Sequence, residues 1–177
     1  MSRSVTFKGA RLVLTGKQVK EGRRAPDFKL ISQDLKEVNL SDFDGKIKVI
    51  NFFPSLDTPV CDLQVKEFNK KAVGLSPDVV VIGVSKDLPF AQARFCSLNG
   101  IKNEIVLSDY RFSSFGLNYG CLIKELNLLA RGTLIIDKNR RIRYIQMVDE
   151  ITHSVDLGQV FNKLQEVVKG HPEAPGK

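Results

Sequence analysis

Cys61 is the residue of this chain whose surroundings most favour chemistry. It ends the segment Pro54-Ser55-Leu56-Asp57-Thr58-Pro59-Val60-Cys61, which follows an apolar run. Thr58 is favourable at a helix N-cap and Pro59 suits the first helical position, so a helix is expected to begin here with Cys61 in its third position. The sulfur would then lie among unpaired backbone N–H groups at the positive end of the helix dipole, which favours the thiolate. The pattern predicts a reactive cysteine rather than an inert core cysteine.

The other two cysteines, Cys96 and Cys121, are far from Cys61 in sequence, and the chain contains no C-x-x-C pair. With only two histidines in the sequence, the three cysteines match no common zinc spacing, so no metal site is expected. A cysteine pair that oxidises in a reducing compartment is usually catalytic or redox-sensing. Taken alone, Cys96 beside Phe95 on an apolar helix is typical of a core cysteine, and Cys121 is also expected to be a small core residue.

The segments around Cys61 predict an α/β fold. Lys48–Phe53 and Val79–Val84 have the length and composition of buried strands, and the sequence between them has helical periodicity. The apolar positions of this helix are Val60, Leu63, Phe68 and Ala72. Two buried strands joined by a helix form a β-α-β unit, which implies a parallel sheet.

The rest of the chain completes a thioredoxin-like fold, a central mixed sheet flanked by helices. The further predicted elements are a helix opened by Asp87-Leu88-Pro89, a strand over Glu104–Leu107, a helix over Tyr110–Leu117, an antiparallel hairpin of Thr133–Asp137 and Arg141–Met147, and a helix over Asp156–Lys169. Val5–Phe7 and Arg11–Leu14 predict an N-terminal β-hairpin, so residues 1–24 form an extension. Residues 1–169 are expected to form one domain, and residues 170–177 a flexible tail.

Composition excludes several classes of protein. Of the 177 residues, 42% are hydrophobic and 27% charged, which is ordinary for a globular protein. The longest apolar runs have strand length, so no membrane span is expected, and the first residues lack a secretory signal, which favours the cytoplasm. The net charge of +7 arises mainly in residues 1–24, which hold seven basic residues and one acidic residue. Without stacking aromatics or a nucleic-acid motif, we interpret this segment as a solvated basic face rather than a partner-binding patch, and no nucleic acid is expected.

The motif Pro-x-x-x-Thr-x-x-Cys at a strand-to-helix junction resembles the peroxidatic motif of peroxiredoxins. Three segments in the same order, Ser55–Cys61, Asp87–Cys96 and Leu128–Arg131, are similar to the bacterial thiol peroxidases, which are atypical two-cysteine peroxiredoxins. The resemblance extends from the N-terminal hairpin to the last helix. The chain departs from the family pattern at Cys121 and at Gly132-Thr133.

This resemblance implies that Cys61 is the peroxidatic cysteine, which attacks a hydroperoxide and becomes a sulfenic acid. It implies that Cys96 is the resolving cysteine, which condenses with Cys61 to an intrachain disulfide. Thr58 is implied to bond the thiolate and the bound peroxide, Arg131 to stabilise the developing negative charge, and Pro54 to shield the pocket. The residues alone leave other roles open, since Arg131 could be a paired structural arginine and Thr58 only a helix cap.

The resemblance further implies a homodimer without metal or organic cofactor, reduced by thioredoxin. Two other functions stay open. A thioredoxin-fold disulfide oxidoreductase needs a nearby second thiol, which Cys61-Asp62-Leu63-Gln64 does not supply. A non-enzymatic redox sensor or binding protein is favoured only by the basic N-terminus. The sequence does not distinguish hydrogen peroxide from bulkier alkyl or lipid hydroperoxides.

Overall fold

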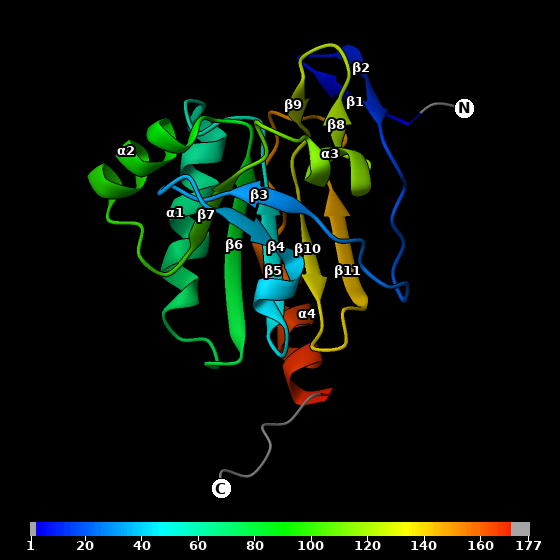
Figure 1. The fold of residues 1–177 in the computed structure, drawn as a ribbon. Helices are drawn as coiled ribbons and strands as arrows, with labels where there is room; N and C mark the ends of the chain where they lie inside the picture. The colour runs from blue at the N-terminus through cyan, green and yellow to red at the C-terminus, as the bar shows by residue number, and fades with distance from the viewer. Residues whose placement is uncertain (1–2, 171–177) are drawn as a thin grey trace, which may run out of the picture.

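A seven-stranded mixed sheet forms the centre of the structure, a computed structural model that describes residues 3–170 (Figure 1). The strands lie in the order β11 (Ile142–Met147), β10 (Gly132–Ile136), β5 (Ile47–Phe52), β6 (Val79–Ser85), β7 (Ile105–Ser108), β3 (Lys29–Ile31) and β4 (Glu37–Asn39). β5, β6 and β7 run parallel, whereas β10 is antiparallel to β5 and β11. The predicted thioredoxin-like arrangement is confirmed, and every residue of β5 is buried.

Helices cover both faces of this sheet. They are α1 (Pro59–Ala72), α2 (Pro89–Asn99), α3 (Ser114–Asn118), α4 (Leu157–Gly170) and the short 3-10 helix η1 (Leu40–Phe43). Val49 of β5 packs with Phe68 of α1 and Leu164 of α4 on one face. Ile50 of the same strand packs with Phe115 of α3 on the other face, as the alternation of side chains along a strand requires. Among residues 3–170, no helix has the length and hydropathy of a membrane span.

The predicted N-terminal hairpin is formed by β1 (Ser4–Phe7) and β2 (Ala10–Thr15). It joins two short strands, β8 (Leu122–Ile123) and β9 (Leu128–Leu129), in a second sheet of order β1-β2-β8-β9. The sequence analysis missed β8 and β9, because two residues are too few to show a strand period. This small sheet holds the segment that leads into Arg131.

Two helix predictions need correction. The helix expected over Tyr110–Leu117 begins only at Ser114, because Ser113 has left-handed backbone geometry with φ of 49°. The carboxylate of Asp109 then accepts hydrogen bonds from the backbone N–H groups of Phe115 and Gly116, at 3.0 and 2.9 Å. At the C-terminus, Gly170 belongs to α4, and the rest of the predicted flexible tail lies outside the described residues.

The buried face of α1 also differs from the predicted apolar stripe. Leu63 is 55% exposed, and the buried positions are Cys61, Gln64, Val65 and Phe68. These positions keep the i, i+3, i+4, i+7 spacing of a helix face, but Gln64 is polar and Cys61 carries a thiol. The hydrophobic period therefore predicted the helix correctly but predicted the wrong face to be buried. Cys61 and Gln64 on the buried face belong to the site described below.

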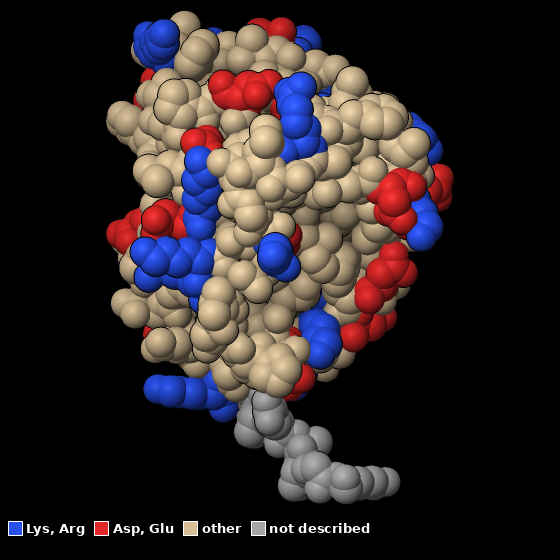
Figure 2. All heavy atoms as spheres, turned by 90° about the vertical axis from the view of Figure 1, so that its left-hand side faces the viewer, with Lys and Arg blue, Asp and Glu red and all other residues tan. Residues whose placement is uncertain are grey.

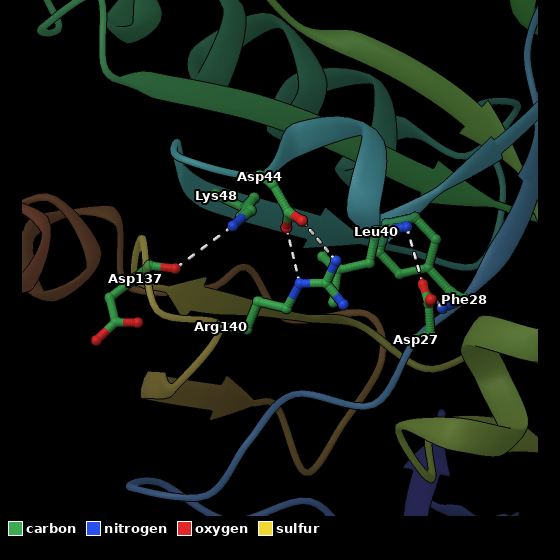
Figure 3. Close-up of polar contacts among 7 residues, drawn as sticks. All are labelled: Asp27, Phe28, Leu40, Asp44, Lys48, Asp137 and Arg140. Atoms are coloured by element: carbon green, nitrogen blue, oxygen red, sulfur yellow. Dashed lines mark hydrogen bonds and ion pairs between the residues drawn. The ribbon is translucent and has the colours of Figure 1, made fainter.

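Polar contacts fasten the sheet at the end where β5 begins (Figure 3). Arg140, in the turn between β10 and β11, donates two hydrogen bonds of 2.7 Å to the carboxylate of Asp44. The buried Lys48 of β5 donates to the backbone carbonyl of Asp137 at 3.4 Å, and burial lowers the pKa of Lys48. The opposite end of β5 leads into the loop that precedes Cys61 and α1.

Candidate active site

The loop after β5 positions Cys61 at the start of α1. Thr58 is the N-cap residue, with extended φ and ψ of −111° and 142°, and Pro59 occupies the first helical position. The Thr58 hydroxyl does not cap the helix as expected, since it donates to the carbonyl of Ser55 at 3.1 Å. Cys61 is the third helical residue, and its side chain is completely buried. Its sulfur thus lies near the positive end of the helix dipole.

Arg131 lies against this sulfur. Its side chain is 2% exposed and extends from the segment between β9 and β10. Nη2 is 3.0 Å from Cys61 Sγ, while Nη1 donates to Gln64 Oε1 at 2.7 Å and Nε donates to the carbonyl of Ile151 at 2.9 Å. None of the ion pairs in residues 3–170 involves Arg131, so no carboxylate neutralises it there. A buried cation that donates to a sulfur is the kind of electropositive environment in which reactive cysteines are found.

Asp87 fixes the loop between Pro54 and Thr58. Its carboxylate accepts hydrogen bonds from the Ser55 hydroxyl at 2.6 Å and from the backbone N–H of Leu56 at 2.8 Å. Asp87 lies two residues before α2, so the loop carrying Cys61 is tied to the start of the helix that carries Cys96. The two cysteine-bearing helices are thereby linked through one carboxylate.

A pocket of about 310 Å³ opens beside the arginine. Pro54, Thr58 and Arg131, three residues singled out from the sequence, contribute to its wall. The other lining residues, mostly apolar in their contact surface, are Phe7, Lys8, Ser55, Pro59, Val60, Leu128, Ile151 and Thr152. Because Phe7 and Lys8 belong to the end of the N-terminal hairpin, this extension forms part of the pocket rather than a separate appendage.

Cys96 lies in the last turn of α2 and is 7% exposed. It shares an apolar cluster with Cys61, and Gln33 Nε2 donates to its sulfur at 3.3 Å. Burial raises the pKa of the Cys96 thiol, and the nearby Glu104 raises it further. Cys121 is completely buried in a separate cluster, and burial strongly raises its pKa as well. All three cysteines are free, and Cys121 occupies the core position expected for it.

The sequence analysis missed three buried polar residues behind Arg131. Gln64, which accepts from Arg131, donates in turn to Asn51 Oδ1 of β5. Asn51 Nδ2 then donates to Glu104 Oε1 at 3.0 Å. Burial raises the pKa of Glu104 to about 8. The polar residue Asn51 in the fully buried strand β5 was the available sequence signal, but its partners are 13 and 53 residues away in the sequence.

The fold is that of a redoxin. The redoxin family model matches residues 20–164, and the chain belongs to that family. It is 49% identical over 163 residues to the thiol peroxidase of Staphylococcus saprophyticus, covering 92% of this chain and 98% of that protein. It is 44% identical to the thiol peroxidase of Bacillus subtilis, covering 93% and 98%. Within the redoxins the chain is therefore a thiol peroxidase, an enzyme of the peroxiredoxin type.

Solved structures agree with this assignment. A peroxiredoxin-like protein from Aquifex aeolicus superposes with a TM-score of 0.88 at 40% identity, covering 95% of this chain and 99% of that one. A thiol peroxidase from Chromobacterium violaceum superposes with a TM-score of 0.83 at 21% identity, which shows the shared fold. The fold and family predicted from the sequence are confirmed.

The raised pKa of Glu104 makes a prediction about stability. Between its ordinary pKa of 4.5 and its folded value of about 8, the native protein holds a proton that the unfolded chain has released. Stability therefore falls as pH rises through this window, by an amount on the order of 5 kcal/mol when Glu104 is fully ionised.

Glu104→Gln does not titrate, so its free energy of unfolding relative to wild type should increase between pH 5 and pH 9 in urea unfolding. Glu67→Gln, at a half-buried position on α1, is the control. A constant difference between Glu104→Gln and wild type would contradict the burial assigned to this carboxyl.

Proposed function

We propose that the enzyme reduces hydrogen peroxide and organic hydroperoxides, with Cys61 as the peroxidatic cysteine. The observation that carries the proposal is the contact of 3.0 Å between Arg131 Nη2 and Cys61 Sγ in a buried site, where no ion pair within residues 3–170 involves the arginine. This contact favours the thiolate, which is the nucleophile that O–O cleavage requires.

In the first step the Cys61 thiolate attacks one oxygen of the hydroperoxide. The S–O bond forms and the O–O bond breaks, so sulfur is oxidised to a sulfenic acid and the leaving alkoxide takes up a proton to become an alcohol or water. Arg131 stabilises the negative charge that develops on the peroxide oxygens, because its guanidinium is fixed before the reaction begins. Thr58 bonds the peroxide at the pocket wall, and Pro54 shields the reacting atoms from bulk water.

The lining of the pocket supports the inclusion of organic hydroperoxides. Phe7, Val60 and Leu128 offer apolar surface to an alkyl chain, whereas Arg131 receives the peroxide group. A pocket with an apolar wall and one polar end binds an amphipathic substrate in a defined orientation. Turnover of cumene hydroperoxide is accordingly expected to exceed that of hydrogen peroxide at equal concentration.

In the second step the Cys96 thiol attacks the sulfenic sulfur of Cys61. A disulfide forms, and the sulfenic hydroxyl leaves with the thiol proton as water. Thioredoxin then reduces this disulfide by passing two electrons from its own dithiol, which requires a reducing compartment such as the cytoplasm. Exposed apolar side chains on α2, the helix that carries Cys96, support a protein reductant and a homodimer. Figure 2 looks at the side of α1 and α2 and shows broad uncharged areas between scattered charges, and Phe90 and Leu98 of α2 are exposed.

Cys61→Ser should abolish peroxide turnover while the protein stays folded, because a serine hydroxyl still accepts a hydrogen bond from Arg131 but is not a nucleophile at neutral pH. Peroxide consumption with thioredoxin and its reductase measures this, and Cys121→Ser serves as the matched control that retains activity. Wild-type turnover in Cys61→Ser would eliminate the mechanism. Disulfide exchange without peroxide would support an oxidoreductase, and a folded but inactive wild type would support a sensor or binding protein.

Arg131→Met should slow the first peroxide step by about 100-fold or more, as the loss of one fixed donor to a developing charge does. Arg131→Lys keeps the charge without the two-pronged geometry and should recover only part of the rate. Stopped-flow reaction of the reduced protein with peroxide measures both variants. If Arg131→Met reacted as fast as wild type, the arginine would have a purely structural role.

Mild peroxide should produce an intrachain Cys61–Cys96 disulfide with local unfolding at the end of α2. The two residues lie on different helices, and a disulfide needs Cα atoms about 4.4 to 6.8 Å apart. Asp87 anchors the start of α2, whereas Gly100 ends the helix in left-handed geometry with φ of 62°. The segment from Phe90 to Gly100 is therefore the easier one to move.

Peptide mapping and hydrogen exchange of reduced and oxidised protein test this prediction together. Faster exchange over residues 90–100 after oxidation is expected, with protection around residues 59–72 less changed. A Cys61–Cys121 bridge, or chiefly interchain bridges, would contradict the pairing. A confirmed Cys61–Cys96 bridge with unchanged protection in both helices would contradict the rearrangement alone.

A further inference from the structure

Four buried residues form a chain of hydrogen bonds that leads from the Cys61 site into the sheet. Arg131 donates to Gln64, Gln64 donates to Asn51, and Asn51 donates to Glu104. The four residues come from the segment before β10, from α1, from β5 and from the segment before β7. Each of them is 5% exposed or less.

The donor chemistry of Arg131 fixes the direction of every bond in this chain. A guanidinium has no acceptor, so Gln64 must turn its Oε1 toward Arg131 and its Nε2 toward Asn51. Asn51 then accepts through Oδ1 and must present Nδ2 to the next residue. Glu104 ends the chain as an acceptor, which a carboxyl group does whether it is ionised or protonated. Neither amide can rotate by 180° without losing two bonds, and Gln64 therefore holds the guanidinium in one plane.

The backbone leaves space for this carboxyl group. Asn51 of β5 is paired in register with Gly83 of β6, and a Cβ atom at residue 83 would lie 2.6 Å from Glu104 Oε1. Glu104 Oε2 is buried without a hydrogen-bond partner in residues 3–170. An apolar side chain of similar size would fill the same space without this desolvation cost. The carboxyl group is therefore poorly explained by stability alone.

We propose that Glu104 is a positioning residue for peroxide reduction, acting through Asn51 and Gln64 to hold the Arg131 guanidinium against the Cys61 sulfur. The proposal rests on the proposed function of Cys61 and Arg131. It adds a residue in the segment before β7 that is three hydrogen bonds away from Arg131 and does not line the pocket.

Glu104 performs this role best when it carries a proton. The Arg131 cation and the Cys61 thiolate neutralise each other, so a neutral Glu104 completes the chain without adding charge. Its pKa of about 8 keeps it mainly protonated at neutral pH. Glu104 is close enough to Cys96 of α2 to raise the pKa of that thiol, and Asn51 and Gln64 separate it from the Cys61–Arg131 pair at the other end of the hydrogen-bond chain. Ionisation above about pH 8 adds a second buried negative charge and should slow an anionic transition state.

Two substitutions at Glu104 separate positioning from packing. Glu104→Met fills the space but removes the acceptor, and Glu104→Gln keeps the acceptor and the shape of the protonated acid. For each variant, the pH dependence of Cys61 alkylation by iodoacetamide and the stopped-flow rate of the first peroxide step are measured on reduced protein. Glu104→Met should raise the alkylation midpoint by about half a pH unit and lower the peroxide rate by about tenfold at pH 7. Glu104→Gln should rescue both values and lose the decline in rate above pH 8.

Gln64→Met and Gln92→Met form a matched pair that keeps the test valid if Glu104→Met does not fold. Both glutamines are buried, but Gln92 donates to Ser85 and to the carbonyl of Leu107, outside the chain of bonds. Gln64→Met should reproduce the shifts expected of Glu104→Met, whereas Gln92→Met should leave the Cys61 alkylation midpoint unchanged.

Folded Glu104→Met or Gln64→Met proteins with a wild-type alkylation midpoint and peroxide rate would overturn the proposal, as would equal shifts in Gln92→Met. Arg131→Met, measured in the same assays, separates this failure from failure of the proposed function. If Arg131→Met also left both values unchanged, the role of the arginine itself would be wrong. If only the Glu104 and Gln64 variants left them unchanged, the arginine would act without the chain behind it.

Discussion

A guanidinium group buried to 2% exposure must be hydrogen-bonded and balanced by an opposite charge, because an uncompensated buried ion costs several kcal/mol. Arg131 donates hydrogen bonds to Gln64 and Ile151, and our proposal assigns the balancing negative charge to the Cys61 sulfur that its Nη2 contacts. In the proposed mechanism, the contact that makes the arginine tolerable in the interior also keeps the cysteine in its nucleophilic form. Stability and reactivity therefore depend on one interaction, and the loop after β5, the start of α1 and the segment before β10 must meet for it to form.

Polar side chains replace apolar ones in the part of the core that lies behind the contact between Arg131 and Cys61. The face of α1 that lies on the sheet carries Phe68 in its middle but Cys61 and Gln64 at its start, and β5 carries Asn51 at the corresponding level. Gln64 donates to Asn51, and Arg131 donates to both Gln64 and Cys61, which avoids the cost of burying unpaired polar atoms. Closer to the opposite end of β5, the paired Arg140 and Asp44 fasten the sheet without reaching the site. The fold thus separates a stabilising end from a reactive end.

Much of the fold could be predicted because its signals are local. The run Lys48–Phe53 predicts a buried strand, and Thr58-Pro59 predicts the helix start that positions Cys61. The two-residue strands β8 and β9 have no such signal. The inward face of α1 was misplaced because the polar Gln64 is buried by its hydrogen-bond partners, whereas the apolar Leu63 is exposed. The contact of Arg131 with Cys61 spans 70 residues. Only the family resemblance pointed to it, and the bonds behind it, through Asn51 and Glu104, required the tertiary structure.

A double-mutant cycle of Cys61→Ala and Arg131→Met tests most directly whether the buried guanidinium is balanced by the Cys61 thiolate. The free energy of unfolding is measured in urea at pH 7.5 for the wild type, both single variants and the double variant, independently of any activity. The account predicts coupling of about 1 to 3 kcal/mol, with Arg131→Met less destabilising in the Cys61→Ala background because it removes a cation that has lost its partner. Additive effects, within about 0.5 kcal/mol, would contradict the account, since they would mean that the arginine gains nothing from the sulfur it touches.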